Sequence, residues 1–121
     1  MSASFSISIE PDYDLIRIDI IGFFSGDDVT RFTHELGFFM GRLRCRPNAH
    51  ITLCNVSGMK IQSQEMVAAF SKVVGDPVFR SRKLAFVTGS TLARMQTRRL
   101  TDRDGVAYFT EAADARAWLL A

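Results

Sequence analysis

Residues 4–20 are Ser-Phe-Ser-Ile-Ser-Ile-Glu-Pro-Asp-Tyr-Asp-Leu-Ile-Arg-Ile-Asp-Ile, and this stretch sets the start of the fold. Apolar and polar residues alternate from Phe5 to Glu10, which is the period-two pattern of a β-strand with one buried face. The same alternation returns from Ile16 to Ile20 after a short link. Neighbouring strands joined by a short link pair antiparallel, so the chain is predicted to open with a β-hairpin.

Helical patterns follow the hairpin. Residues 26–43 carry apolar side chains at three- and four-residue steps, and the hydroxyl of Ser25 can cap a helix there. A second helix is predicted after Ser63 and ends at Gly75-Asp76-Pro77. A third runs from about residue 90 to 100, and a final alanine-rich helix is capped by Thr110.

Three further strands are predicted between these helices, at residues 51–56 before a Ser57-Gly58 turn, 84–88 and 106–109. The run 84–88 is nearly all apolar, as is typical of a strand buried on both faces. The element order is ββαβαβαβα, in which later strands lie parallel with right-handed crossovers. The prediction is one α/β domain over residues 1–121, with an antiparallel hairpin followed by mainly parallel strands.

Composition supports an ordinary globular protein. The chain has 121 residues, of which 47% are hydrophobic and 23% charged, and this length suits one domain. The spacing of Cys45 and Cys54 fits neither a metal-ligand motif nor a redox pair, so both thiols are expected to be reduced. The chain lacks a secretory signal pattern and an apolar run long enough to span a bilayer, so a cytoplasmic protein is expected.

The sequence offers little for catalysis. The histidines are His34 and His50, and neither has a second ligand at metal-binding spacing, so no metal and no cofactor are predicted. His34 lies away from the apolar stripe of its helix and is expected to face solvent. His50 precedes a strand and is expected to be exposed in a loop or to act as a capping donor. An enzyme is therefore the third choice among the functions considered.

Ligands of open α/β sheets bind beyond the carboxyl ends of the parallel strands, and Gly89-Ser90-Thr91 follows one such end. Free N–H groups and two hydroxyls at a helix start can hold an anion. Ordinary helix capping explains the same residues. Both interpretations stay open.

Charge is distributed unevenly along the chain. Residues 1–35 carry a net charge of −5, residues 36–103 of +9 and residues 104–121 of −2. In the basic segment, Arg94 and Arg98 share one exposed helix face. This face is either a docking patch for an acidic protein, nucleotide or lipid head group, or a solvated surface neutralised by the acidic segments. A protein partner is favoured over nucleic acid, because the basic residues lack interleaved aromatics.

Arg99 falls on the inward face of the third helix, beside Leu92 and Met95. A buried arginine needs a carboxylate partner, within the fold or at a subunit interface. Alternatively, its aliphatic stem packs on the core with the head group in water.

Phe38 lies nearly opposite the apolar stripe of the first helix, between Gly37 and Gly41. A large exposed aromatic residue between two small ones suggests a contact surface. A single exposed apolar residue is the other interpretation.

The order and spacing of these segments resemble the STAS class of anti-sigma-factor-antagonist-like domains, and especially its small bacterial SpoIIAA-like branch, related to lipid-binding Sec14 domains. The resemblance covers nearly the whole chain. The stretches that carry it are Leu15-Ile16-Arg17-Ile18, residues 22–28, residues 84–89, Leu92-Ala93-Arg94-Met95-Gln96 and residues 108–119.

The resemblance implies a non-catalytic module that docks to a partner protein, often under control of serine phosphorylation at the start of the second helix. Ser63 is the matching phosphoacceptor, and Gln62 stands where phosphorylatable members carry an aspartate. A helix N-cap is the alternative role of Ser63.

The preferred function is thus a non-enzymatic interaction or regulatory module, expected to form a homo-oligomer, with a dimer favoured. The alternative is a carrier or sensor of a lipid or small anion. Its apolar pocket would be closed by Phe23, Phe24 and Phe39, with the anion near residues 89–91. Ten phenylalanines in one core explain the aromatic richness equally well.

Overall fold

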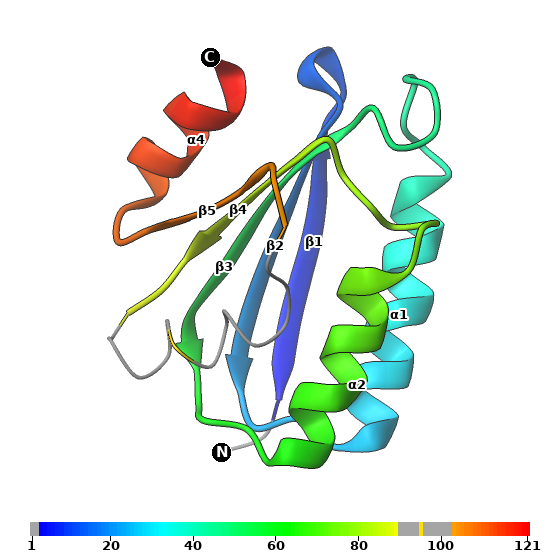
Figure 1. Cartoon of the computed structure of the whole chain (residues 1–121). Helices are drawn as coiled ribbons and strands as arrows, with labels where there is room; N and C mark the ends of the chain where they lie inside the picture. Colours follow the sequence, from blue (N-terminus) through cyan, green and yellow to red (C-terminus); the bar gives the residue numbers. More distant parts are fainter. Residues whose placement is uncertain (1–2, 90–94, 96–102) are drawn as a thin grey trace.

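The opening hairpin forms as the alternating pattern predicts. The computed structural model describes residues 3–89, 95 and 103–121 (Figure 1). Strands β1 (Ser4–Glu10) and β2 (Leu15–Gly22) pair antiparallel and are joined by a 3-10 turn, η1 (Pro11–Tyr13). Asp14 closes this turn in the left-handed region at φ 47°, which an aspartate tolerates better than most residues. The hairpin prediction is confirmed.

The remaining strands add to β2 in parallel. Strands β3 (Ile51–Met59), β4 (Lys83–Val87) and β5 (Val106–Phe109) complete a five-stranded sheet in the order β1-β2-β3-β4-β5. The α/β class and the parallel arrangement of the later strands are therefore confirmed. The strand order itself could not be read from the sequence, because each pairing joins segments far apart along the chain.

Strand β3 continues past the turn that the sequence predicts. Ser57-Gly58 lies inside the strand, where the register against β2 shifts between Asp19 and Ile21. A Cβ atom at position 58 would lie 3.1 Å from Cγ1 of Ile21. The predicted turn is wrong: the small residues mark an irregularity in the ladder and a close approach of β2.

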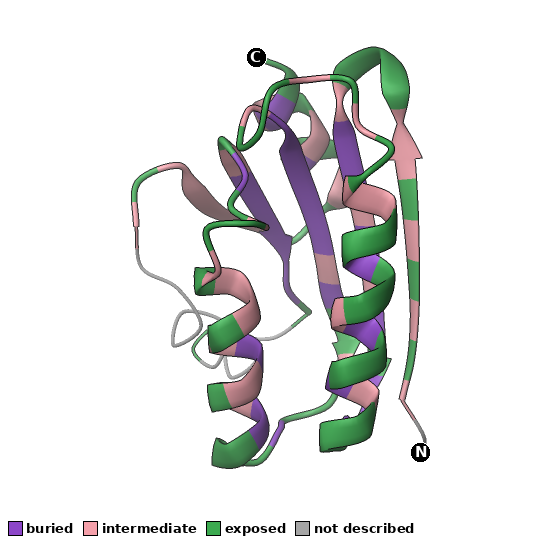
Figure 2. Ribbon diagram, turned by 90° about the vertical axis from the view of Figure 1, so that its right-hand side faces the viewer, coloured by how far each residue is buried: buried purple, intermediate pink, exposed green. Residues whose placement is uncertain are grey.

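The helices cover the two faces of the sheet unequally. Helices α1 (Gly26–Met40) and α2 (Gln64–Gly75) lie on one face, and α4 (Ala112–Leu120) packs against β3, β4 and β5 on the other (Figures 1 and 2). Strand β4 contributes Leu84 and Phe86 to the core beneath α1 and α2. Its alternate residues Ala85 and Val87 contribute to the core beneath α4. The predicted two-faced burial of this strand is confirmed.

Helix α1 ends at Met40 rather than at residue 43. Gly41 follows as the C-cap, and glycine is a poor helix former. The carboxylate of Asp14 then accepts hydrogen bonds from the backbone N–H groups of Arg44 (2.9 Å) and Cys45 (3.2 Å). These bonds hold the chain in a path that leaves the helix, and periodicity alone cannot reveal them.

Two expectations concern the later helices. Thr110 does not cap α4: the N-cap position is Glu111, whose side chain makes no capping hydrogen bond. The third helix falls on residues 90–100, where only Met95 is described. Met95 is 55% exposed, so its predicted inward orientation is wrong.

Two glycines provide a matched test of these backbone assignments. Gly105 has φ +84°, and a Cβ there would lie 2.8 Å from the carbonyl oxygen of Arg82, whereas a Cβ on helical Gly37 meets nothing within 4 Å. Gly105→Ala should lower the free energy of unfolding by about 2 kcal/mol or more. Gly37→Ala should raise it by about 0.5–1 kcal/mol. Urea unfolding measures both, and equal effects would contradict the strained turn at Gly105.

Candidate functional site

The carboxyl ends of the parallel strands lie together at the lower end of the sheet in Figure 1. Strand β2 leads through residues 23–25 into α1, and β3 leads through residues 60–63 into α2. Open α/β sheets bind their ligands at this end. Functional residues were therefore sought here first.

Both helices begin with a serine that caps them. Ser25 Oγ accepts a hydrogen bond from the backbone N–H of Asp28 (3.2 Å), whose carboxylate accepts one from the backbone N–H of Ser25 (2.9 Å). Ser63 Oγ accepts one from the backbone N–H of Met66 (3.2 Å), and Ser63 is exposed. The N-cap roles of both serines are confirmed. Phosphorylation of Ser63 stays a prediction.

Gln62 fastens the two loops together. Its buried side-chain oxygen accepts a hydrogen bond from the backbone N–H of Phe24 (2.9 Å), and its Nε2 donates to the carbonyl of Gly22 (2.9 Å) and to that of Lys60. The backbone N–H of Lys60 also donates to the Gly22 carbonyl (3.1 Å). The parallel pairing of β2 and β3 thus continues into the loops through a side chain.

Large apolar residues face solvent along the same two segments. Phe23 is 51% exposed, and Ile21 and Ile61 are each 44% exposed. Together with the exposed Ser63 they are called the carboxyl-end surface below. All three apolar residues lie at or just beyond the carboxyl ends of the paired strands β2 and β3, and exposed large apolar residues at one end of a sheet favour contact with another molecule. The sequence pattern does not reveal these residues as a surface, and Phe23 was expected to close an internal pocket.

Close packing of the backbone explains the glycine at position 89, the first residue of the predicted anion site. A Cβ at this position would lie 3.1 Å from the carbonyl oxygen of Ser57. The glycine therefore permits the ends of β3 and β4 to approach each other, without any ligand. Ser90 and Thr91, like Arg94, Arg98 and Arg99 of the predicted interface, lie outside the described residues.

Phe38 lies on the outer side of α1, as predicted. It is 57% exposed, and the guanidinium of Arg42 lies 4.6 Å from the centroid of its ring. Gly37 and Gly41 beside it are exposed. The geometry leaves Phe38 available for a contact, and the contact itself stays a prediction.

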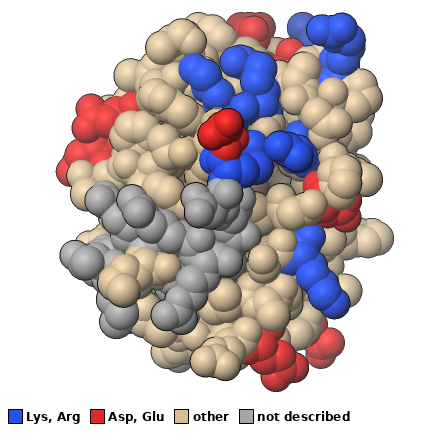
Figure 3. All heavy atoms as spheres, in the orientation of Figure 1, with Lys and Arg blue, Asp and Glu red and all other residues tan. Residues whose placement is uncertain are grey.

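The basic middle segment is described only in part, and the helix face of Arg94 and Arg98, whose neutralisation was one interpretation, lies outside the described residues. Among the described residues the ion pairs join Arg17 to Asp19, Arg31 to Asp28 and Arg116 to Glu10, and none uses a base from residues 36–103. Figure 3 shows Lys and Arg side chains gathered around one acidic side chain on the face drawn there.

His50 is buried, not exposed. Its side chain is 1% exposed, and within the described part of the chain neither ring nitrogen has a hydrogen-bond partner of ordinary geometry. Burial lowers the pKa of His50, and the Phe79 carbonyl and the charge of Asp14 oppose this only in part. His34 is exposed, as predicted. No local pattern indicates the burial of His50, because the segments that enclose it are distant along the chain.

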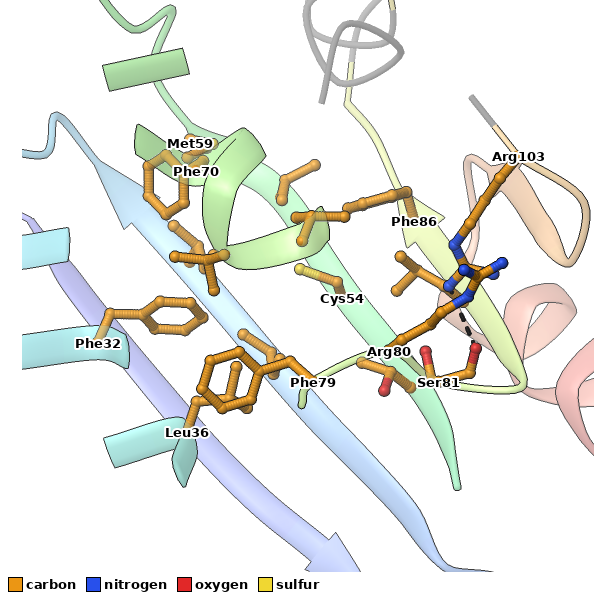
Figure 4. A pocket seen from close by; sticks show the side chains of 17 residues that line it. Phe32, Leu36, Cys54, Met59, Phe70, Phe79, Arg80, Ser81, Phe86 and Arg103 are labelled. Carbon is orange, nitrogen blue, oxygen red and sulfur yellow. Dashed lines mark hydrogen bonds between the residues drawn. The ribbon is translucent and has the colours of Figure 1, made fainter. Parts of the chain in front are cut away.

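An apolar cavity of about 70 Å³ lies between the sheet and helices α1 and α2 (Figure 4). Arg80, Ser81 and Arg103 lie together at one end of it. Phe23, Phe24 and Phe39, which were predicted to close an apolar pocket, do not line this cavity. The described aromatic residues in its wall are Phe32, Phe70, Phe79 and Phe86.

No protein-family model matches the chain, and no curated protein matches it in sequence at a significant level. A solved structure does match: an uncharacterised Shewanella loihica protein of the DUF3478 family, which has a SpoIIAA-like fold. It aligns with a TM-score of 0.76 and 16% identity over 98% of this chain and 96% of its own. This chain has a SpoIIAA-like fold.

Two further structures of the SpoIIAA-like fold match nearly the full length. An anti-sigma factor antagonist from Mycobacterium paratuberculosis aligns with a TM-score of 0.59 and 9% identity over 98% of this chain and 96% of its own. The anti-sigma factor antagonist SpoIIAA, in its unphosphorylated form, aligns with a TM-score of 0.56 and 10% identity over 97% of each chain. At these identities the likeness is one of fold.

The described part of this SpoIIAA-like chain has neither a membrane-spanning helix nor a cluster of metal ligands. No described helix is both long and apolar enough to cross a bilayer. Within the described ranges, no group of three His, Cys, Asp or Glu side chains could hold a metal ion.

The role of Gln62 can be tested by removing its amide. Gln62→Ala leaves the buried backbone N–H of Phe24 without its side-chain partner, and the Gly22 carbonyl keeps only its bond from the Lys60 N–H, so the free energy of unfolding should fall by about 2–3 kcal/mol. Amide NMR resonances of residues 22–24 and 60–63 should shift the most. Exposed Gln64, two residues along the chain, is the matched control, and Gln64→Ala should change stability by less than about 0.5 kcal/mol. Equal losses for the two variants would contradict the fastening role.

The burial of His50 predicts a dependence of stability on pH. Because its folded-state pKa lies below the usual value of about 6.5, the unfolded chain binds a proton that the folded chain does not. Stability should therefore fall as the pH drops below about 6.5 toward the depressed pKa. His50→Leu should flatten this part of the profile, and His34→Gln should leave it intact. Urea unfolding between about pH 5 and 7.5 measures it, and an unchanged slope in His50→Leu would refute the assignment.

Proposed function

We propose that this chain is a non-catalytic regulatory module that docks to a partner protein through the carboxyl-end surface. The observation that carries the proposal is the exposure of Ile21, Phe23 and Ile61 beside exposed Ser63. Ile21 lies near the end of β2, and Gln62 joins the loops that carry Phe23 and Ile61, so the surface is formed before any partner arrives. Such preorganisation lowers the cost of binding. Two proteins of the same fold are named as anti-sigma factor antagonists, which supports a regulatory role.

Phosphorylation of Ser63 would switch this docking. Its hydroxyl is exposed at the N-terminus of a 12-residue helix, where the helix dipole tolerates a phosphate group. A phosphoserine carries a charge of about −1.5 to −2 at pH 7. That charge beside Phe23 and Ile61 would disfavour an apolar partner surface, and it would favour a basic one.

A second contact, at Phe38, would serve self-association. Phe38 projects from the outer side of α1 with Gly37 and Gly41 beside it, so another surface could approach the helix closely. The homo-oligomer, with a dimer favoured, is proposed to form here. This places the two contacts on separate parts of the molecule.

The two surfaces can be distinguished by variants of similar exposure. Proteins captured from a lysate are identified by mass spectrometry, and affinity is then measured with the purified partner. Phe23→Glu should weaken its binding at least about tenfold, because aromatic anchors dominate interface energies. Phe38→Glu should preserve that affinity and lower the mass seen by light scattering. Ser63→Asp should change the affinity, whereas Ser25→Asp, which conserves an N-cap, should change it less.

Some outcomes would contradict the proposal. If Phe23→Glu and Ile61→Glu bind the partner as the unmodified chain does, the carboxyl-end surface is not the docking site. If Phe38→Glu alone abolishes partner binding while the mass stays constant, α1 is the docking site instead.

A further inference from the structure

The cavity beneath α2 combines an apolar interior with a cationic end. Its wall is formed by aliphatic and aromatic side chains of β2, β3, β4, α1 and α2. Arg80 and Arg103 enter the lining from the segments that precede β4 and β5, on either side of Ser81 (Figure 4). Arg80 is exposed and Arg103 is half-buried, so the cationic end of the cavity lies at the molecular surface, where a ligand can reach it.

The two arginines are brought together without a carboxylate between them. Arg103 donates hydrogen bonds to the backbone carbonyls of Ser81 (3.1 Å) and Asp104 (3.0 Å). Within the described residues, neither Arg80 nor Arg103 forms an ion pair. Burial lowers the pKa of Arg103, and the positive charge of Arg80 lowers it further. Positive charge therefore accumulates at this end of the cavity and would be relieved by an anion.

The dimensions and chemistry of the cavity restrict what could occupy it. At about 70 Å³ it is roughly half the ~150 Å³ of an apolar cavity that admits benzene. The space suits part of one hydrocarbon chain, and the two chains of a phospholipid would not fit. The planar guanidinium group matches a carboxylate, which it can bind through two parallel hydrogen bonds.

We propose that this cavity binds a single-chain aliphatic carboxylate, with the hydrocarbon tail among Phe70, Phe79 and Phe86 and the carboxylate held by Arg80 and Arg103. The proposal is independent of docking at the carboxyl-end surface. The proposed site differs from the pocket predicted from the sequence in its apolar part and in its anion-binding part. Other aromatic residues line the cavity, and arginine side chains hold the carboxylate in place of a helix start.

The test uses the full chain and a series of defined probes. Butanoate, hexanoate and octanoate are titrated by calorimetry and by methyl NMR, with octanol and octylamine as probes of the same tail and a different head. Affinity should rise with chain length until the cavity is filled. Octanoate should bind at least about tenfold more tightly than octanol. Methyl resonances of Ile18, Ile20 and Met59 should shift, and those of Leu119, in the core beneath α4, should stay in place.

Substitutions test the head-group contact separately from folding. Arg80→Gln should weaken octanoate binding about tenfold, in the range expected for one charge-assisted hydrogen bond, while octanol binding stays unchanged. Arg103→Gln should also weaken octanoate binding and leave octanol binding unchanged. The bonds of Arg103 to Ser81 and Asp104 also support the fold, so Arg80→Gln is the principal variant. Arg82→Gln is the matched control: Arg82 is exposed and does not line the cavity, so octanoate affinity should be preserved.

Three results would overturn the proposal. Equal affinities for octanoate and octanol would show that the arginines do not recognise the head group. Methyl shifts confined to surface residues would place the probe outside the cavity. Stronger binding to anionic phospholipid vesicles than to free octanoate, lost in Arg80→Gln, would assign the arginines to a membrane surface. Loss of partner binding in Phe23→Glu would leave the octanoate result unchanged, so the two proposals fail independently.

Discussion

The buried amide of Gln62 joins the two loops from which helices α1 and α2 begin. A parallel sheet releases its chain at the carboxyl end of each strand, and the backbone groups exposed there need new hydrogen-bond partners. Gln62 supplies them to Gly22 and Phe24 across the gap between the loops. The Gln62 side chain consequently positions the loops before α1 and α2 and the solvent-facing side chains that these loops carry. No backbone ladder alone would fix these loops relative to each other.

Much of the fold could be predicted because its pattern is local. The alternating hairpin, the apolar run of β4 and the capping serines Ser25 and Ser63 are all recognisable within a few residues. The end of α1 could not be predicted in this way, since the side chain of Asp14, 30 residues from its partner Arg44, determines the path there. The burial of His50 and the irregularity at Ser57-Gly58 likewise depend on segments that meet only in three dimensions.

For the candidate sites as well, local patterns could be predicted from the sequence, and contacts between distant segments could not. Ser63 could be found because a capping residue before a helical pattern is a local signal. The exposure of Ile21, Phe23 and Ile61 could not, because an apolar residue in a sequence is by default assigned to the core. The ten phenylalanines fitted a packed core and an apolar pocket equally well, because periodicity cannot say which rings line a void and which face water.

Cys54, in the wall of the cavity, has a chemical consequence of its own. Burial raises the pKa of its thiol to about 12. At pH 7 only about one molecule in 100,000 then carries the thiolate, the form that reacts with oxidants and alkylating reagents. The folded chain thus shields a sulfur atom that the unfolded chain would expose. Modification of the Cys54 thiol would therefore report each opening of the helices away from the sheet.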